Sequence, residues 1–218
     1  MMYKASLLGL ALISPYLFAE ELPSALEGID IFRMPSVYVG LSVNSGLIEL
    51  TSPKIGEEVK FKGDNNLAVQ LGLMQPAAYF GESRWGYHTE LYVMSLDNKF
   101  DAEDATRYRN GDISGYSVVA EPVLFYQWGS ASTCGNCKGL RLQAGVGGRY
   151  VDIDGDVSSS NDTVRLSHSG FGFSSHLALV GHYGHWELAL RLNSAVKVDD
   201  GDTELRKGMS QVTFGYRF

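Results

Sequence analysis

Eight stretches of the sequence alternate between apolar residues and small or polar residues with a period of two. This period is typical of β-strands that present two different faces. Most stretches are about ten residues long or slightly longer, which is the length that a strand needs to cross a bilayer. The predicted strands are 37–44, 67–74, 87–94, 116–128, 140–150, 170–183, 186–197 and 212–218.

One face of each predicted strand is apolar or aromatic, and the other face is small or polar. In the stretch 140–150, for example, Leu142 and Val146 lie on the first face, and Arg141 and Gln143 on the second. A soluble β-sandwich encloses its apolar faces, whereas a membrane barrel turns them outward to lipid. The sequence therefore predicts an all-β fold, a closed antiparallel eight-stranded transmembrane β-barrel with up-and-down connections and small or polar inward faces throughout.

Pro122 lies inside one of the predicted strands. Proline cannot donate a hydrogen bond to a sheet ladder. We expect a bulge or a local break at this position.

The N-terminus predicts a signal peptide. Lys4 supplies a short basic region, and residues 5–18 form an apolar run. A membrane-anchoring helix is the alternative, but the run is shorter than the ~20 residues needed to span a bilayer and contains Pro15. The expected organisation is a signal peptide over 1–19, a periplasmic segment over 20–35 and the barrel over 36–218.

The connections between predicted strands alternate in length. Residues 45–66, 97–114, 152–169 and 199–207 are long connections, and residues 75–84, 129–138 and the turn at Gly184 are short ones. Outer-membrane barrels have long external loops and short periplasmic turns. An even strand number then places both termini in the periplasm. Trp85, Trp128 and Trp186 fall at the periplasmic strand ends, where indole prefers the bilayer interface.

Two segments carry a family resemblance: the ending FGYRF, residues 214–218, and GVGGRYVDID, residues 145–154. They resemble the small eight-stranded outer-membrane barrels, the family that contains the membrane domain of outer membrane protein A and outer membrane proteins X and W. The resemblance implies insertion by the outer-membrane assembly machinery and contact with outer-membrane lipids and lipopolysaccharide. Members of the family are membrane anchors, adhesins, resistance factors or narrow channels, and related barrels are lipid-modifying enzymes. The resemblance therefore does not select one function.

The chain has 25 acidic and 18 basic residues, a net charge of −7, which argues against nucleic acid as a partner. Acidic residues gather in the second and fourth long connections: Asp97, Asp101, Glu103, Asp104 and Asp112, and Asp199, Asp200 and Asp202. They could bind divalent cations that bridge lipopolysaccharide phosphates, or they form a solvated face.

We expect a non-enzymatic surface or structural protein that serves adhesion, envelope integrity or resistance. It would use no cofactor, and an extracellular ligand or a host surface is its candidate partner. The alternative is a narrow channel for small solutes, with a lateral opening at the Pro122 break.

Charged side chains on the inward faces predict an ion-pair network. Its candidate members are Glu90, Glu121, Arg141, Arg149, Glu187 and Arg191. Glu90 and Glu121 fall at similar heights on neighbouring strands, with Arg191 across the barrel. Two carboxylates in a poorly solvated interior need a cation, and the interior of such a barrel is just wide enough for side chains. A rigid, closed barrel is expected; the alternatives are a gated polar pathway and an acid–base site.

Cys134 and Cys137 lie in one predicted periplasmic turn. An oxidising compartment favours a local disulfide between them. The alternative is a zinc site, in which both cysteines are joined by His182 and His185 from the next periplasmic turn.

Overall fold

The computed structural model describes residues 36–218 except 53, 75–76, 101–106, 131–135 and 201–202, and it leaves out the side chains of 63–66, 199–200 and 203–208. The described residues all belong to one compact unit, Arg33–Phe218. The predicted signal peptide and periplasmic segment lie outside the described residues. Within the described part of the chain, no helix has the length and hydrophobicity that a bilayer crossing requires.

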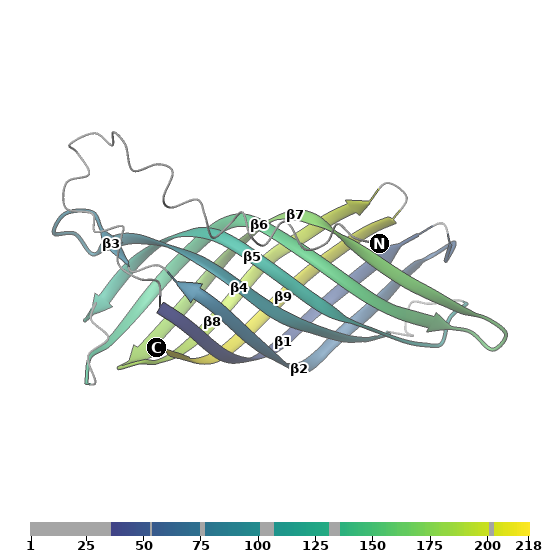
Figure 1. Ribbon diagram of the computed structural model, residues 1–218, viewed down its shortest axis with the longest axis horizontal. Coiled ribbons are helices and arrows are strands. Elements are labelled where there is room, and N and C mark those ends of the chain that lie inside the picture. Colours follow the sequence, from purple (N-terminus) through teal and green to yellow (C-terminus); the bar gives the residue numbers. More distant parts are fainter. Residues whose placement is uncertain (1–35, 53, 75–76, 101–106, 131–135, 201–202) are drawn as a thin grey trace. The chain divides into compact units, whose positions relative to one another are not determined.

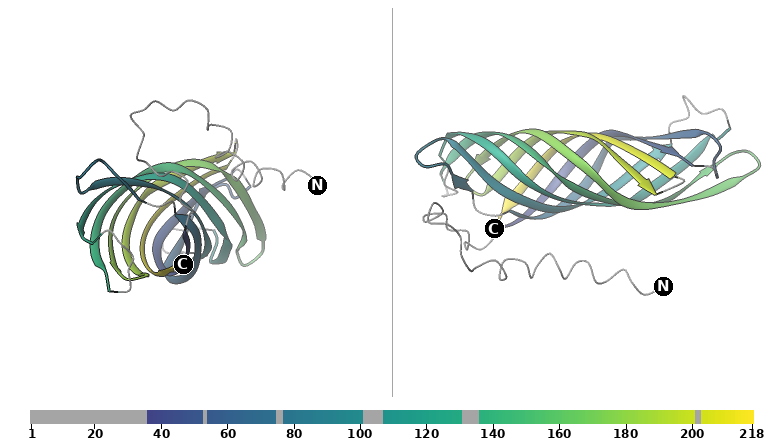
Figure 2. Two further views of the ribbon diagram at one scale, coloured as in Figure 1. Left: turned by 60° about the vertical axis from the view of Figure 1, so that its left-hand side comes forward. Right: turned by 90° about the horizontal axis from the view of Figure 1, so that it is seen from above.

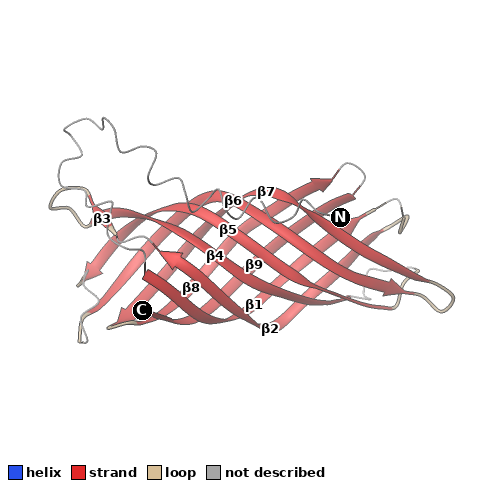
Figure 3. Cartoon of the chain, viewed as in Figure 1, coloured by secondary structure: helices blue, strands red, loops and turns tan. Residues whose placement is uncertain are grey.

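All regular structure in the described residues is β-strand (Figure 3). The strands are β1 Ser36–Thr51, β2 Glu58–Met74, β3 Ala78–Tyr79, β4 Trp85–Phe100, β5 Asn110–Gly129, β6 Lys138–Ser158, β7 Thr163–Tyr183, β8 Trp186–Asp200 and β9 Thr203–Arg217 (Figure 1). The two-residue strand β3 pairs only with the start of β4.

The other eight strands close a ring. Each pairs antiparallel with the next along the chain, and β9 pairs with β1, as in Tyr38 opposite Arg217 and Leu41 opposite Phe214. Figure 2 shows the tilted strands wrapped around a common axis. The predicted eight-stranded antiparallel barrel is confirmed, including its closure by the C-terminal strand.

The strands are longer than the sequence pattern predicted. The ring strands have 15 to 21 residues, whereas ~9–11 residues cross a bilayer. The prediction of long external loops over 45–66, 97–114, 152–169 and 199–207 is therefore wrong, because most of these residues continue the strands. The β6–β7 hairpin projects farthest, at the end opposite the C-terminus (Figure 1).

The alternation continues into these extensions, but its polarity reverses. On β6, Leu142 and Val146 point outward and are exposed, whereas farther along the strand Val151 and Ile153 point inward and are buried. Asp154 then takes the outward, exposed position. An apolar outer face suits lipid and a polar outer face suits water, so the reversal indicates that the first part of the strand crosses the membrane and the second part projects from it.

The reversal divides the barrel into two halves. We call segments 46–62, 96–114, 151–170 and 194–209 the projecting half, and the remaining parts of the eight strands the membrane half. Buried apolar side chains fill the projecting half: Ile48, Leu50, Val59, Phe61, Leu96, Ile113, Val151, Ile153, Val157, Leu166, Val196, Val198 and Met209. The expectation of small or polar inward faces throughout is wrong in the projecting half. In the membrane half it holds only in part, because Val119, Val123 and Phe125 also face inward and are buried.

Several ladders between neighbouring strands are irregular. Register shifts lie between Asn44 and Gly46 in the β1–β2 pairing and between Asn193 and Val196 in the β8–β9 pairing. Next to Pro122, the β5–β6 pairing skips from Ala120 to Val123 without a register shift, so the expected local break is present and no bulge forms. The β2–β4 pairing is interrupted between Lys62 and Gln70. The β7–β8 ladder ends at His176 opposite Asn193.

Beyond that last pair, β7 and β8 stay in contact through a hydrogen bond from the Ser175 backbone N–H to Ser194 Oγ at 2.9 Å and through packing. Gly172 of β7 lies against Val196 and Val198 of β8, and a Cβ at this glycine would clash with Val196 and with the Lys197 carbonyl. The absence of a side chain therefore lets the two strands pack closely beyond the end of the backbone ladder.

Candidate functional site in the barrel interior

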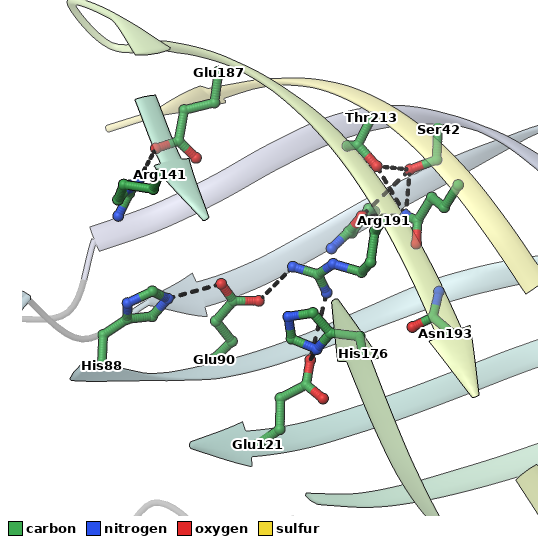
Figure 4. Close-up of polar contacts among 12 residues, drawn as sticks. Ser42, His88, Glu90, Glu121, Arg141, His176, Glu187, Arg191, Asn193 and Thr213 are labelled. Carbon is green, nitrogen blue, oxygen red and sulfur yellow. Dashed lines mark hydrogen bonds and ion pairs between the residues drawn. The ribbon is translucent and has the colours of Figure 1, made fainter. Parts of the chain in front are cut away.

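Arg191 lies between two carboxylates in the membrane half. Its Nη2 donates to Glu90 Oε2 at 2.7 Å, and its Nη1 donates to Glu121 Oε1 at 3.4 Å (Figure 4). The two glutamates are direct partners in the β4–β5 ladder, and the arginine reaches them from β8. All three side chains are buried. One guanidinium thus joins two carboxylates that would otherwise repel each other.

Two buried histidines extend this group. His88 Nε2 lies 2.8 Å from Glu90 Oε1, and His176 Nδ1 lies 2.9 Å from Glu121 Oε1 (Figure 4). We call the five residues the central cluster. Both histidines lie at inward positions of the strands predicted over 87–94 and 170–183, but they are not among the predicted members of the ion-pair network. The spacing of His88 and Glu90, two residues apart on one strand face, was the available signal.

A second group lies nearer the C-terminal end of the barrel. Arg141 Nη2 donates to Glu187 Oε1 at 2.7 Å, and Arg217 Nη2 donates to the same oxygen. We call these three residues the lower cluster. The Arg141 guanidinium also lies 5.7 Å from the ring centroid of Phe125, within the range of a cation–π contact.

Arg149 lies apart from both clusters. It is fully buried, and its Nη2 donates to Asn193 Oδ1 at 3.1 Å. In the part of the chain that the structure describes, it forms no ion pair. The six predicted residues thus separate into two ion-pair groups and one arginine without a carboxylate.

Around Gln211, the wall formed by β1, β2 and β9 carries hydrogen bonds between neutral side chains. Gln211 Nε2 lies within 2.8–2.9 Å of Gln70 Oε1, Ser42 Oγ and Thr213 Oγ1. The Ser42 and Thr213 hydroxyls are 2.9 Å apart. These bonds connect the first strands to the last, so they stabilise the closure of the ring.

The interior leaves little free space. A cavity of about 30 Å³ lies between the central cluster and the β2–β4 wall, with Tyr38, Tyr92 and Glu187 in its lining. This volume has room for about one water molecule. The arrangement can hold charges and protons in place, but this cavity is too small for an organic substrate.

The cysteine turn is only partly described. Cys137 is disulfide-bonded, and Cys134 lies outside the described residues, so the pairing between them stays a prediction. His182 is buried, and His185 Nδ1 lies 2.9 Å from the Arg217 carbonyl oxygen. No group of three or more histidine, cysteine, aspartate or glutamate residues that could hold a metal occurs among the described residues.

The expected acidic loops are also only partly described. Asp97 and Asp112 lie on the outward faces of β4 and β5, not in loops. Asp101, Glu103, Asp104, Asp199, Asp200 and Asp202 fall on residues or side chains that the structure does not describe.

No family model and no curated protein matches the sequence. Solved structures with a similar fold include Ail, the attachment invasion locus protein of Yersinia pestis, at 16% identity over 83% of this chain and 98% of that one, with a TM-score of 0.40. Outer membrane protein OprG from Pseudomonas aeruginosa is 13% identical over 85% and 97%, with a TM-score of 0.46. Neisserial surface protein A is 12% identical over 84% and 97%, with a TM-score of 0.45. The likeness is one of fold and transfers no residue or function.

Proposed function

We propose that the protein is a non-enzymatic surface protein of the bacterial outer membrane. Its barrel is a closed, rigid platform, and its projecting half presents acidic walls to the extracellular medium. The observation that carries the proposal is that side chains fill the barrel along its length, with ion pairs in one half and an apolar core in the other. A filled barrel gives solutes no axial path. Export by a cleaved signal peptide and periplasmic termini belong to the same proposal.

The mouth of the projecting half supports a closed barrel. Ile55, in the β1–β2 connection, and Tyr108, just before β5, are both buried. The Tyr108 hydroxyl donates to the Ile55 carbonyl at 3.4 Å, and the Arg107 backbone N–H donates to Glu57 Oε1 at 3.3 Å. These contacts join the two connections across the end of the apolar core.

The outer wall of the projecting half supports contact with the surroundings. Asp112 of β5 is opposite Lys99 of β4 on one side and Asp156 of β6 on the other. Asp154 follows on the same outward face of β6. Arg165 of β7 is opposite Asp156, so this row carries two carboxylates between two cations. The carboxylates are the groups that would bind divalent cations and bridge them to lipopolysaccharide phosphates.

Two measurements test this function. In planar lipid bilayers, the purified barrel is expected to give no reproducible single-channel steps, and regular steps would contradict the closed platform. On intact cells, a cysteine introduced in the exposed β6–β7 turn, S160C, is expected to react with a membrane-impermeant maleimide. Labelling only after the outer membrane is permeabilised would contradict surface exposure.

A narrow lateral pathway is the second candidate, because the β2–β4 ladder is interrupted. At this place a cavity of about 20 Å³ is lined by the outward-facing Leu67 and Ser95 and by the inward-facing Ala68 and Met209. The Val69 backbone N–H donates to Ser95 Oγ at 3.3 Å, which holds the two strands together there. The break at Pro122 is less favourable for an opening, because the strands keep their register.

A swelling assay distinguishes the two functions. Proteoliposomes loaded with small sugars should not swell if the barrel is a platform. Swelling that is abolished by L67W, and unchanged by the matched lipid-facing substitution L142W, would favour the lateral pathway.

A further inference from the structure

Arg149 lies at the boundary between the two halves of the barrel. It is on the inner face of β6, opposite Val119 of β5 and Gly172 of β7. The next inward residue toward the projecting end is the buried Val151. A fully buried guanidinium next to an apolar core needs a partner, because an isolated buried charge is strongly destabilising.

The hydrogen bonds of Arg149 are incomplete. Nη2 donates to Asn193 Oδ1 at 3.1 Å, and the Asn193 amide in turn donates to the Met209 carbonyl at 3.3 Å. Nε and Nη1 of Arg149 are buried and have no protein partner among the described residues. A guanidinium can only donate, so the group that completes this site must be an acceptor.

The charges of the interior point to a negatively charged acceptor. Glu187 is paired with two arginines of the lower cluster, and Arg191 serves the two carboxylates of the central cluster. A histidine lies against each of these two carboxylates. For Arg149 no carboxylate of the described residues lies within ion-pair distance, and the inward-facing arginines exceed the inward-facing glutamates by one.

Three hydroxyl groups lie in the ladder row of Arg149 or in the next inward-facing row on either side of it. Tyr92 shares the row of Val119 and Arg149, Ser117 lies opposite Val151, and Ser174 lies opposite Gly147. Their oxygens are buried and have no partner among the described residues. Hydroxyl and guanidinium groups can all donate to one acceptor.

We propose that Arg149 binds a small monovalent anion of halide size inside the barrel, at the boundary between the membrane half and the projecting half. The guanidinium supplies the positive charge, and neighbouring hydroxyls supply further donors. The proposal does not depend on the proposed function, because a closed platform requires no interior ligand.

Crystallography with bromide in place of chloride tests the site directly. An anomalous bromide peak within hydrogen-bond distance of the Arg149 guanidinium is expected in the wild-type barrel. A water molecule alone at this place, a carboxylate of the chain against Arg149, or bromide peaks only on the surface would overturn the proposal.

A solution experiment tests the same site without a crystal. Replacing gluconate by chloride at constant ionic strength should raise the midpoint temperature of unfolding of the wild type by several degrees, because the anion binds only the folded state. R149M should lose this response. The control R141M should keep it, because Glu187 still has Arg217 as a partner. An equal response of R149M and the wild type would contradict the proposal. If R149M does not fold, the bromide experiment on the wild-type barrel tests the site.

Discussion

The membrane half and the projecting half are built from the same strands but have opposite interiors. In the membrane half, the inner face carries ion pairs such as Arg191 with Glu90, and the outer face carries leucines such as Leu142. In the projecting half, the inner face carries Phe61 and Ile153, and the outer face is polar. The backbone geometry is the same in both, so the surrounding solvent decides which face is apolar.

The two interiors are also held together by different forces. Burial of apolar area, at ~25 cal/mol per Å², stabilises the projecting half without directional contacts. The membrane half depends on charged groups that are favourable only when every partner is present. Single substitutions should therefore have effects that depend on the half and on the face in which they lie.

The largest effect is expected at Arg191. R191M leaves Glu90 and Glu121 side by side without their cation, which should lower the free energy of unfolding by about 3–5 kcal/mol. Urea unfolding of the barrel refolded in lipid vesicles measures this loss. The triple variant R191M/E90Q/E121Q removes the repulsion and should recover most of the stability. If the triple variant is as unstable as R191M, the pairing account of the central cluster is wrong.

A similar loss is expected in the core of the projecting half. I153A removes a fully buried side chain and should cost about 2–5 kcal/mol. The neighbouring substitution D154A changes an exposed outward position and should stay within about 0.5 kcal/mol of the wild type. Equal small effects at both positions would indicate that residues 151–158 form a loop without a core.

The outer faces of the two halves should respond differently to an added charge. L142R places an arginine on the lipid-facing surface and should destabilise by about 2–4 kcal/mol. S167R makes the same kind of change on the outward face of the projecting half and should be close to neutral. An equal cost at both positions, measured by urea unfolding in vesicles, would place the membrane boundary elsewhere.

The smallest effect is expected in the cysteine turn. Replacing Cys134 and Cys137 by serine removes a short covalent loop, which should cost about 2 kcal/mol or less and leave insertion intact. Thiol titration of the denatured, metal-free and unreduced wild type checks the bond itself. Two free thiols, together with zinc in the native protein, would favour the site with His182 and His185.

The strands of the membrane half could be predicted because lipid outside and side chains inside produce one constant pattern. The projecting half could not be predicted in the same way. Val151 and Ile153 keep the period of two, but their apolar character lies on the opposite face, and this reversal resembles the end of a strand. The sequence pattern therefore predicts a loop over residues 152–169, although they form the projecting end of the β6–β7 hairpin.

Part of the interior site followed from register alone. The positions of Glu90 and Glu121 along neighbouring strands, and of Arg191 across the barrel, predict similar heights in the interior. These three side chains meet as expected. The contacts of His88 and His176 depend on side-chain rotamers that the strand pattern does not specify. For the same reason, the separation of Arg149 from the carboxylates could not be anticipated from its inward position.

Hydrogen–deuterium exchange of the barrel in lipid nanodiscs tests the continuation of the strands beyond the membrane most directly. Because β6 and β7 pair from Lys138 opposite Tyr183 to Ser158 opposite Thr163, the interstrand hydrogen-bonded amides of 151–157 and 164–170 should be strongly protected. Their exchange should resemble that of 140–148 in the membrane half. Rapid exchange across 151–170, as in a solvated loop, would contradict the account of two halves with opposite interiors.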